Sequence, residues 1–182
     1  TQVRLQGGKV SYLSAIFKNP TINLFLLVPR IIFSRLLGYN IFHLHWTYPF
    51  ALKTSFWKVL FMQKILHRHY LFCLWVIKKL GYKLVWTAHN VLPHEKIFID
   101  DTAARKDLVK YTDTVIGHSS KTFKELIKIG VVPKKYVVIP HGNYLDVYQN
   151  TTTKEEARER LGLSMDEFIF LFFGQIRDYK GV

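Results

Sequence analysis

Residues 83–95 read KLVWTAHNVLPHE, and this stretch decides the fold class of the chain. Its first half is an apolar run that ends at His89, which predicts a buried strand at 83–89. Apolar residues recur at helical spacing just before it, from about residue 55 to 80, and Gly81 is placed to end that helix. A helix that leads into a buried strand is the repeating unit of parallel α/β sheets.

The same alternation of helices and strands continues on both sides of this stretch. We therefore predict an α/β fold, a Rossmann-like parallel sheet with helices on both faces. Further strands are expected at 41–46, 113–117, 136–140 and 168–173, and further helices at about 101–110, at 120–129 between Ser119 and Gly130, and at 154–161 before Gly162.

The composition is that of a folded protein. Hydrophobic residues make up 49% of the 182 residues, and at about 100–200 residues per domain this length holds one domain, or one domain and the start of another. Cys73 is the single cysteine, which excludes an intrachain disulfide and favours a reducing, cytoplasmic location. No apolar stretch reaches the about 18 residues of a membrane-spanning helix. Because the chain begins with Thr1, we expect further residues upstream.

The positive charge is concentrated in the first half of the chain. The net charge is +13, and residues 1–94 hold twelve of the 26 lysines and arginines but no carboxylate. Between residues 56 and 83 the bases alternate with aromatic residues, which allows an anionic membrane surface, a nucleic acid, or plain solvent as their neighbour. No nucleic-acid-binding motif accompanies these bases, so we expect that the protein does not bind nucleic acid. The bases that would face a membrane are Lys58, Lys64, Arg68, Lys78, Lys79 and Lys83.

Five motifs carry a family resemblance. IPHG at 139–142, RERLGL at 158–163 and FFGQIRDYKG at 172–181 follow one another in the C-terminal part, and HLHW at 43–46 and WTAHNVLPHE at 86–95 precede them. Together they resemble retaining, GT-B-fold glycosyltransferases of family 4, of the bacterial exopolysaccharide type. The last loop departs from the family pattern at Gln175 and Ile176, and Asn143 and Tyr144 replace the Val-Asp that usually follows the first motif.

The resemblance implies an enzyme that moves a sugar from a nucleotide diphosphate sugar, with retention, to a polysaccharide or a lipid-linked oligosaccharide. It implies an acceptor-side domain at 1–163 and the beginning of a donor-binding domain at 164–182, so this chain alone is expected to be an inactive fragment. It also implies an enzyme that needs no metal or other cofactor. The location is expected from the composition instead: the single cysteine favours the cytoplasm, and the basic first half favours a peripheral position on the inner face of the plasma membrane. The alternative is a non-catalytic sugar- or lipid-binding α/β module.

The site residues follow from the same motifs. His89 is the expected catalytic residue, since it matches the family's active-site histidine and ends a parallel strand, where such sheets bind ligands. Gly174, Arg177 and Lys180 match the loop that binds the donor, and the two cations suit a diphosphate leaving group. His43 and His45 share a strand face, but no third metal ligand of suitable spacing is evident, so no metal is expected. Further candidates for the acceptor or the cleft are His45, Asn90, Glu95, His118, His141 and Gly142.

Overall fold

The computed structural model describes residues 10–11, 24–46, 60–94, 96–143, 147, 151–174 and 176. The chain divides into two units, Thr1–Pro140 and His141–Val182, and each is described by itself. The boundary expected after residue 163 stays a prediction.

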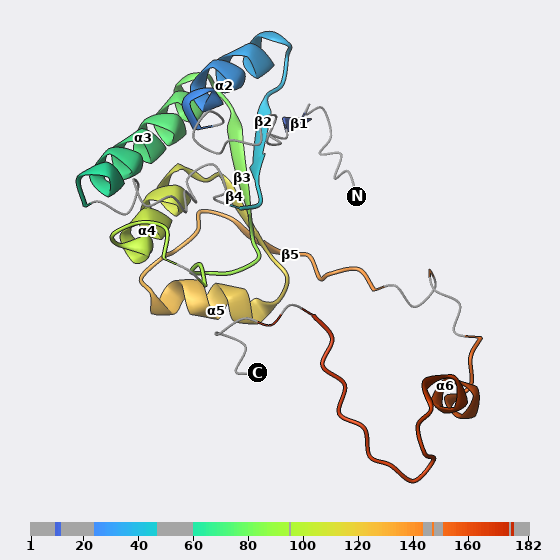
Figure 1. Cartoon of the computed structure of the whole chain (residues 1–182). Coiled ribbons are helices and arrows are strands. Elements are labelled where there is room, and N and C mark those ends of the chain that lie inside the picture. Colours follow the sequence, from blue (N-terminus) through green and yellow to red (C-terminus); the bar gives the residue numbers. More distant parts are fainter. Residues whose placement is uncertain are drawn as a thin grey trace. The chain divides into compact units, whose positions relative to one another are not determined.

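The first unit is built on a parallel five-stranded sheet (Figure 1). Its strands follow the order of the sequence, so each pairs with the next, and the register aligns Ile41 with Lys83 and Val85 with Thr114. This arrangement confirms the α/β, Rossmann-like fold class. Four expected strands are present with ends within two residues of the prediction, and the short first strand adds a fifth. The strands are β1 (Val10–Ser11), β2 (Ile41–Leu44), β3 (Lys83–Ala88), β4 (Thr114–Gly117) and β5 (Tyr136–Val138).

Four helices of this unit share one hydrophobic core with the sheet. They are α2 (Leu27–Leu36), α3 (Leu60–Lys79), α4 (Asp101–Tyr111) and α5 (Ser120–Lys128), and α2 and α3 lie side by side (Figure 1). The even-numbered residues of β3, Leu84, Trp86 and Ala88, enter this core. Val85 and Thr87 on the opposite face of β3 are buried as well, so both faces of this central strand are covered.

Helix α2 is not predicted from the sequence, because Pro29 interrupts its apolar run. Pro29 is the third residue of the helix, within the first turn, where a backbone N–H has no partner inside the helix. A proline is therefore tolerated at this position. Leu27 and Ile31, one turn apart, are buried in the core, which holds the helix on the sheet.

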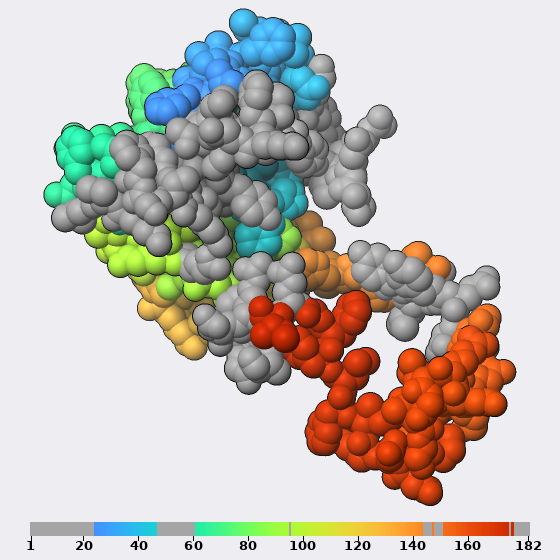
Figure 2. All heavy atoms as spheres, viewed as in Figure 1, coloured from blue at the N-terminus to red at the C-terminus, as the bar shows by residue number. Residues whose placement is uncertain are grey.

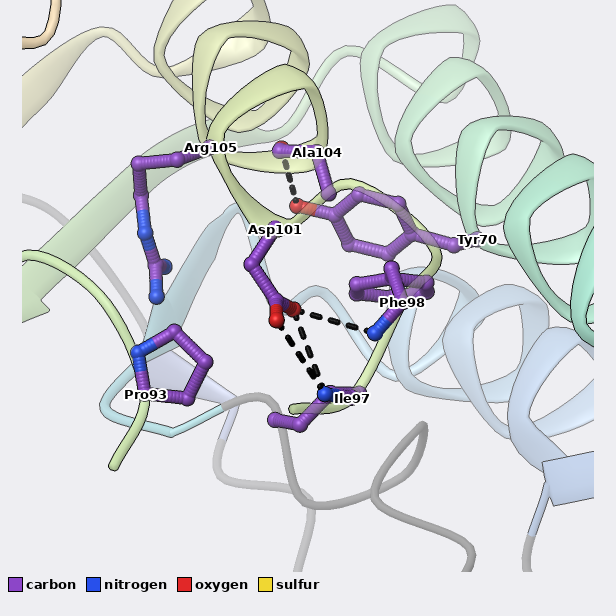
Figure 3. Close-up of a pocket in the computed structure, with 7 residues that line it drawn as sticks. All are labelled: Tyr70, Pro93, Ile97, Phe98, Asp101, Ala104 and Arg105. Atoms are coloured by element: carbon purple, nitrogen blue, oxygen red, sulfur yellow. Dashed lines mark hydrogen bonds between the residues drawn. The ribbon is translucent and has the colours of Figure 1, made fainter. Parts of the chain in front are cut away.

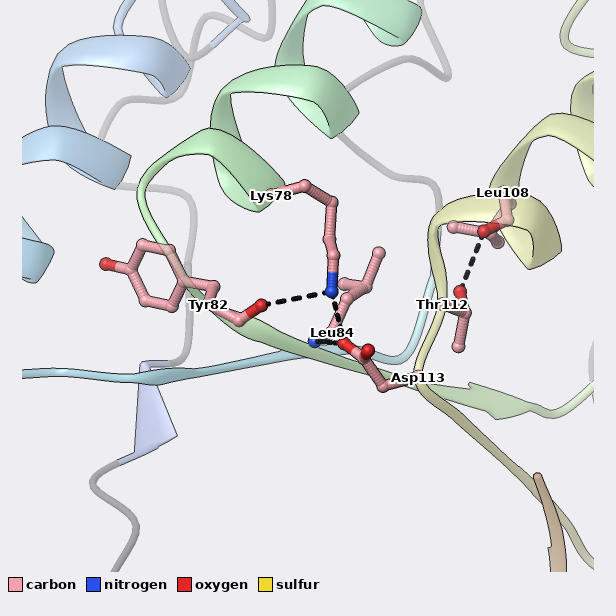
Figure 4. A network of polar contacts seen from close by, with 6 residues as sticks. All are labelled: Lys78, Tyr82, Leu84, Leu108, Thr112 and Asp113. Atoms are coloured by element: carbon pink, nitrogen blue, oxygen red, sulfur yellow. Dashed lines mark hydrogen bonds and ion pairs between the residues drawn. The ribbon is translucent and has the colours of Figure 1, made fainter. Parts of the chain in front are cut away.

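A network of half-buried polar contacts ties the amino ends of β3 and β4 to the end of α3 (Figure 4). Asp113 Oδ2 accepts hydrogen bonds from the backbone N–H of Leu84 at 2.8 Å and from Lys78 Nζ at 2.6 Å, and Lys78 Nζ also donates to the Tyr82 carbonyl at 3.3 Å. Partial burial raises the pKa of Asp113, but the bonds from Lys78 and Leu84 outweigh it, so the pKa lies below its ordinary value. The network fixes where β3 and β4 begin relative to each other.

The second unit contributes one described helix, α6 (Lys154–Leu161), at the predicted place. A capping box begins it: Thr153 Oγ1 accepts from the Glu156 N–H, and the Glu156 carboxylate accepts from the Thr153 N–H. Gly162 ends it with a φ of +66°, a left-handed conformation that favours glycine.

The prediction of a strand at 168–173 is wrong. These residues, FIFLFF, form no strand and their side chains are exposed. A strand that is apolar on both faces needs neighbouring strands and cover on two sides. The described residues of the second unit offer it a single helix and no sheet to join.

None of the helices in the described part of the chain combines the length and the apolar character that a membrane crossing needs.

Candidate active site

Three histidines follow three neighbouring strands of the sheet. His45, His89 and His118 are the first residues after β2, β3 and β4, respectively. Because these strands run parallel, all three residues lie at the carboxyl edge of the sheet. Open parallel α/β sheets bind their ligands outside this edge. We call His45, His89 and His118 the histidine row.

Hydrogen bonds connect the row from end to end. His45 Nδ1 lies 3.1 Å from His89 Nε2, and His89 Nδ1 lies 3.2 Å from His118 Nε2. The chain of contacts ends at β5, where His118 Nδ1 lies 2.9 Å from the carbonyl oxygen of Ile139. All three rings are half-buried, so they are partly shielded from water and still accessible from the edge.

An aromatic side chain sets the plane of the central ring. The indole of Trp46 stacks on His89 with ring centroids 4.6 Å apart and an interplanar angle of 7°. The His45 ring also stacks near His89, at 5.4 Å. With stacking on its faces and hydrogen bonds at both nitrogens, His89 is held in one orientation.

A fourth histidine supports the row from within β2. His43 Nε2 lies 2.8 Å from Thr87 Oγ1, and its ring centroid lies 4.2 Å from that of His45. Burial, with smaller contributions from His45 and His89, lowers the pKa of His43 to about 4. Burial, followed by His118, also lowers the pKa of His45. His43 and His45 are therefore neutral at pH 7, and the site resists the accumulation of positive charge.

The loop after β3 is fastened to α4 (Figure 3). Arg105 Nε donates to the Val91 carbonyl at 2.7 Å, and its guanidinium lies 4.5 Å from the centroid of the Trp86 ring. One turn earlier, Asp101 accepts a hydrogen bond from the Phe98 N–H at 3.0 Å. These contacts hold both ends of the 91–98 loop and keep the residues after His89 in place.

A small cavity lies behind this loop (Figure 3). Its volume of about 10 Å³ is room for roughly one water molecule, so it cannot hold a sugar. The residues that line it are Tyr70, Pro93, Ile97, Phe98, Asp101, Ala104 and Arg105.

The structure brings three of the predicted site residues together, His45, His89 and His118. Asn90, next along the chain from His89, is half-buried. The predicted residues that belong to the second unit are His141, Gly142 and Gly174, of which Gly174 has a φ of +140°. Those that lie outside the described residues are Glu95, Arg177 and Lys180.

Three residues with clear roles at this edge were not among the predicted site residues: Trp46, Thr87 and Arg105. Trp46 carries a detectable signal, an aromatic residue directly after two histidines that alternate along a strand. Thr87 also lies in a recognised motif. Arg105 has no such signal, because its contacts with Val91 and Trp86 join positions far apart in the sequence.

Comparison with known proteins agrees with this geometry. The model of Glycosyltransferase Family 4 matches residues 27–146, which is more than half of the chain and includes the whole histidine row. No curated protein and no solved structure matches the chain significantly. The extent of the family match shows that the chain belongs to glycosyltransferase family 4.

Proposed function

We propose that the chain is the acceptor-side part of a transferase that moves a sugar, with retention, from a nucleotide diphosphate sugar to a hydroxyl group of a polysaccharide or lipid-linked oligosaccharide. The observation that carries this proposal is the histidine row at the carboxyl edge of a family 4 domain. Ordered, half-buried polar rings at this edge are a site prepared for a ligand.

His89 is the residue that we propose to contact the reacting sugar. It is the central member of the row and its ring is held by Trp46, His45 and His118. A side chain fixed in this way aids a reaction because little further ordering is needed when the transition state forms.

On the donor side, we propose that Arg177 and Lys180 neutralise the diphosphate and that Gly174 lets the loop backbone approach it. The φ of +140° at Gly174 lies in a region that side chains other than glycine rarely adopt, which supports the glycine's part in this loop. Two cations close to the leaving phosphate would stabilise its developing charge without a metal ion.

A second proposal concerns where the enzyme works. One face of α3 carries exposed residues at helical spacing, which we call the outer stripe: Phe61, Lys64, Ile65, Arg68, Phe72, Trp75 and Lys79. Figure 2 shows atoms of α2 in blue and of α3 in teal and green at the surface of this view. Exposed aromatic rings mixed with bases favour binding to an anionic membrane.

Not all of the predicted membrane-facing bases belong to the outer stripe. Lys83 is exposed at the start of β3, whereas Lys78 is half-buried and paired with Asp113, and Lys58 lies outside the described residues. We therefore propose Lys64, Arg68 and Lys79 as the bases that meet the lipid headgroups. With a lipid-linked acceptor, this would place the enzyme on the cytoplasmic face of the plasma membrane.

The first prediction tests the proposed catalysis. In the natural full-length protein, assayed with a panel of nucleotide sugars, His89→Ala should lower turnover by about 100-fold or more, because it removes a group held at the reacting centre. The matched control is His67→Gln, a histidine of α3 that contacts Asp107 away from the row. Normal turnover in His89→Ala would contradict the role of His89. A full-length protein that binds sugars or lipids but transfers none would favour the non-catalytic module.

A further inference from the structure

We infer that His118 is a positioning residue that fixes the tautomer of His89. In this tautomer His89 Nε2 is a hydrogen-bond acceptor, so the substrate group that it binds is a hydroxyl. This inference rests on the proposed function for its substrate, but not for the tautomer itself. The hydrogen bonds of the row end at Ile139, whose backbone carbonyl can only accept a hydrogen bond.

The Ile139 carbonyl determines which nitrogen of His118 carries a proton. His118 Nδ1 lies 2.9 Å from this oxygen and must therefore be the donor, Nδ1–H. In a neutral imidazole the other nitrogen is then an acceptor, so His118 Nε2 bears no proton. A single backbone atom of the chain thus sets the tautomer at the end of the row.

The tautomer of His118 determines the tautomer of His89. His118 Nε2 is an acceptor and lies 3.2 Å from His89 Nδ1, so His89 donates from Nδ1–H. His89 Nε2 is then the acceptor, and it receives the Nδ1–H of His45 at 3.1 Å. Every member of the row has the same tautomer, with the proton on Nδ1.

Backbone contacts keep the starting point of this chain in place. The Ile139 N–H donates to the Gly117 carbonyl at 2.9 Å, which joins β5 to β4 directly before His118. The Tyr136 hydroxyl donates to the Ser119 carbonyl at 2.7 Å, directly after it. A Cβ on Gly117 would collide with the Tyr136 hydroxyl, so a side chain there would force the Tyr136 ring to move. Residues on both sides of His118 are therefore fixed against β5.

The tautomer decides which substrate group His89 can recognise. In this structure the unprotonated Nε2 of His89 accepts a hydrogen bond from the Nδ1–H of His45. It can accept one from a substrate hydroxyl in the same way. It cannot bond to an oxygen of a diphosphate, which is itself an acceptor. A sugar hydroxyl that reaches His89 would replace the Nδ1–H of His45, whereas the phosphates must be bound by other groups.

The experiment measures the tautomer directly. In the full chain labelled with ¹⁵N-histidine, two-bond ¹⁵N–¹H spectra at neutral pH distinguish a protonated from an unprotonated ring nitrogen, and His89→Gln assigns the signals of His89. We expect Nδ1–H and a bare Nε2 at His89. In His118→Ala this tautomer should lose its dominance, and in His118→Gln, whose amide oxygen can replace Nε2 as acceptor, it should persist. His67→Gln is the control and should leave the His89 signals unchanged.

A dominant Nε2–H tautomer at His89 in the unaltered chain, or one that does not respond to His118→Ala, would overturn the inference. In the full-length enzyme, His118→Ala should lower turnover by about tenfold or more and His118→Gln should restore most of it, because a histidine in the wrong tautomer is a poor catalyst. Failure of the proposed function is a separate result: the tautomer would be as expected, but His89→Ala would keep its turnover.

Discussion

At the level of single residues, His43 shows how the site depends on neutral imidazoles. Its ring lies within β2, between the Thr87 hydroxyl and the His45 ring, and cannot easily hold a charge there. Burial and its histidine neighbours lower its pKa to about 4, whereas the unfolded chain has the ordinary value of about 6.5. His43 thus links the stability of the fold to pH.

The second prediction follows from this pKa. Between about pH 6.5 and pH 4 the unfolded chain binds a proton at His43 that the folded chain does not, so the free energy of unfolding should fall as the pH is lowered through this range. The shift corresponds to at most about 3 kcal/mol, which solvent screening of the partly exposed ring reduces to about 1 kcal/mol. Urea unfolding at pH 7 and pH 4.5 measures it.

The control for this prediction is His43→Gln, which keeps a polar group near Thr87 but does not titrate. Its stability should fall less between the two pH values than that of the unaltered chain. Asp113 loses its charge only below its ordinary pKa, so it contributes little above pH 4. An equal loss in both proteins would show that His43 is not the source.

At the level of elements, α3 has two chemically different sides. Leu66, Tyr70 and Leu74 on its inner side belong to the core, which accounts for its stability in the fold. The outer stripe is exposed, and Phe61 keeps 65% of its surface in solvent. Lys79 Nζ lies 5.9 Å from the centroid of the Trp75 ring, so base and aromatic are adjacent. Core packing therefore does not explain the aromatic residues of this stripe.

The third prediction tests the outer stripe. The chain should sediment with vesicles that contain anionic lipid at low salt, release as the salt concentration rises, and ignore purely zwitterionic vesicles. Reversing two charges, Lys64→Glu with Arg68→Glu, should weaken vesicle binding by about tenfold or more, at about 1 kcal/mol per base near the surface.

The matched control for the vesicle experiment reverses two exposed lysines of α4, Lys106→Glu with Lys110→Glu, so that the net charge changes equally. Circular dichroism checks that both variants fold. Equal binding to anionic and zwitterionic vesicles, or equal loss in the two double variants, would remove the outer stripe as a membrane surface.

At the level of the whole molecule, the two units differ in how far their apolar side chains are buried. The first unit has a hydrophobic core between its helices and its sheet, whereas residues 168–173 of the second unit expose their side chains, with Phe170 at 90% and Phe173 at 94%. A run of this length with high β-propensity and no charge is typical of segments that pair with another chain.

The fourth prediction is that the 182-residue chain associates with itself through this segment. Light scattering should show a mass that rises with concentration, and Phe170→Lys should lower it by placing a charge in the run. Val132→Lys, at an exposed position of the first unit, is the control and should have no effect. If both variants associate as the unaltered chain does, the contact lies elsewhere.

Much of the fold could be predicted from the sequence because its signals are local. The strand at 83–88 and the helices α4, α5 and α6 depend on apolar periodicity, on N-cap residues such as Ser119 and on glycines such as Gly130 and Gly162. Helix α2 and the missing strand at 168–173 could not, since the first is held on the sheet by the burial of Leu27 and Ile31 in the core and the second needs partners from a sheet. Local patterns do not contain that information.

The sequence by itself determined the parallel α/β class and the concentration of bases before Glu95, and it predicted His89 as a site residue. Alternation of helix and strand, charge and a strand-end motif are all properties of consecutive residues. Only the tertiary structure decided that His45, His89 and His118 meet in one row, that Lys78 is engaged with Asp113, and that Trp46 and Arg105 support the site. These contacts join residues from different strands and helices, and their distances depend on the register and packing of the sheet, which no single stretch of the chain specifies.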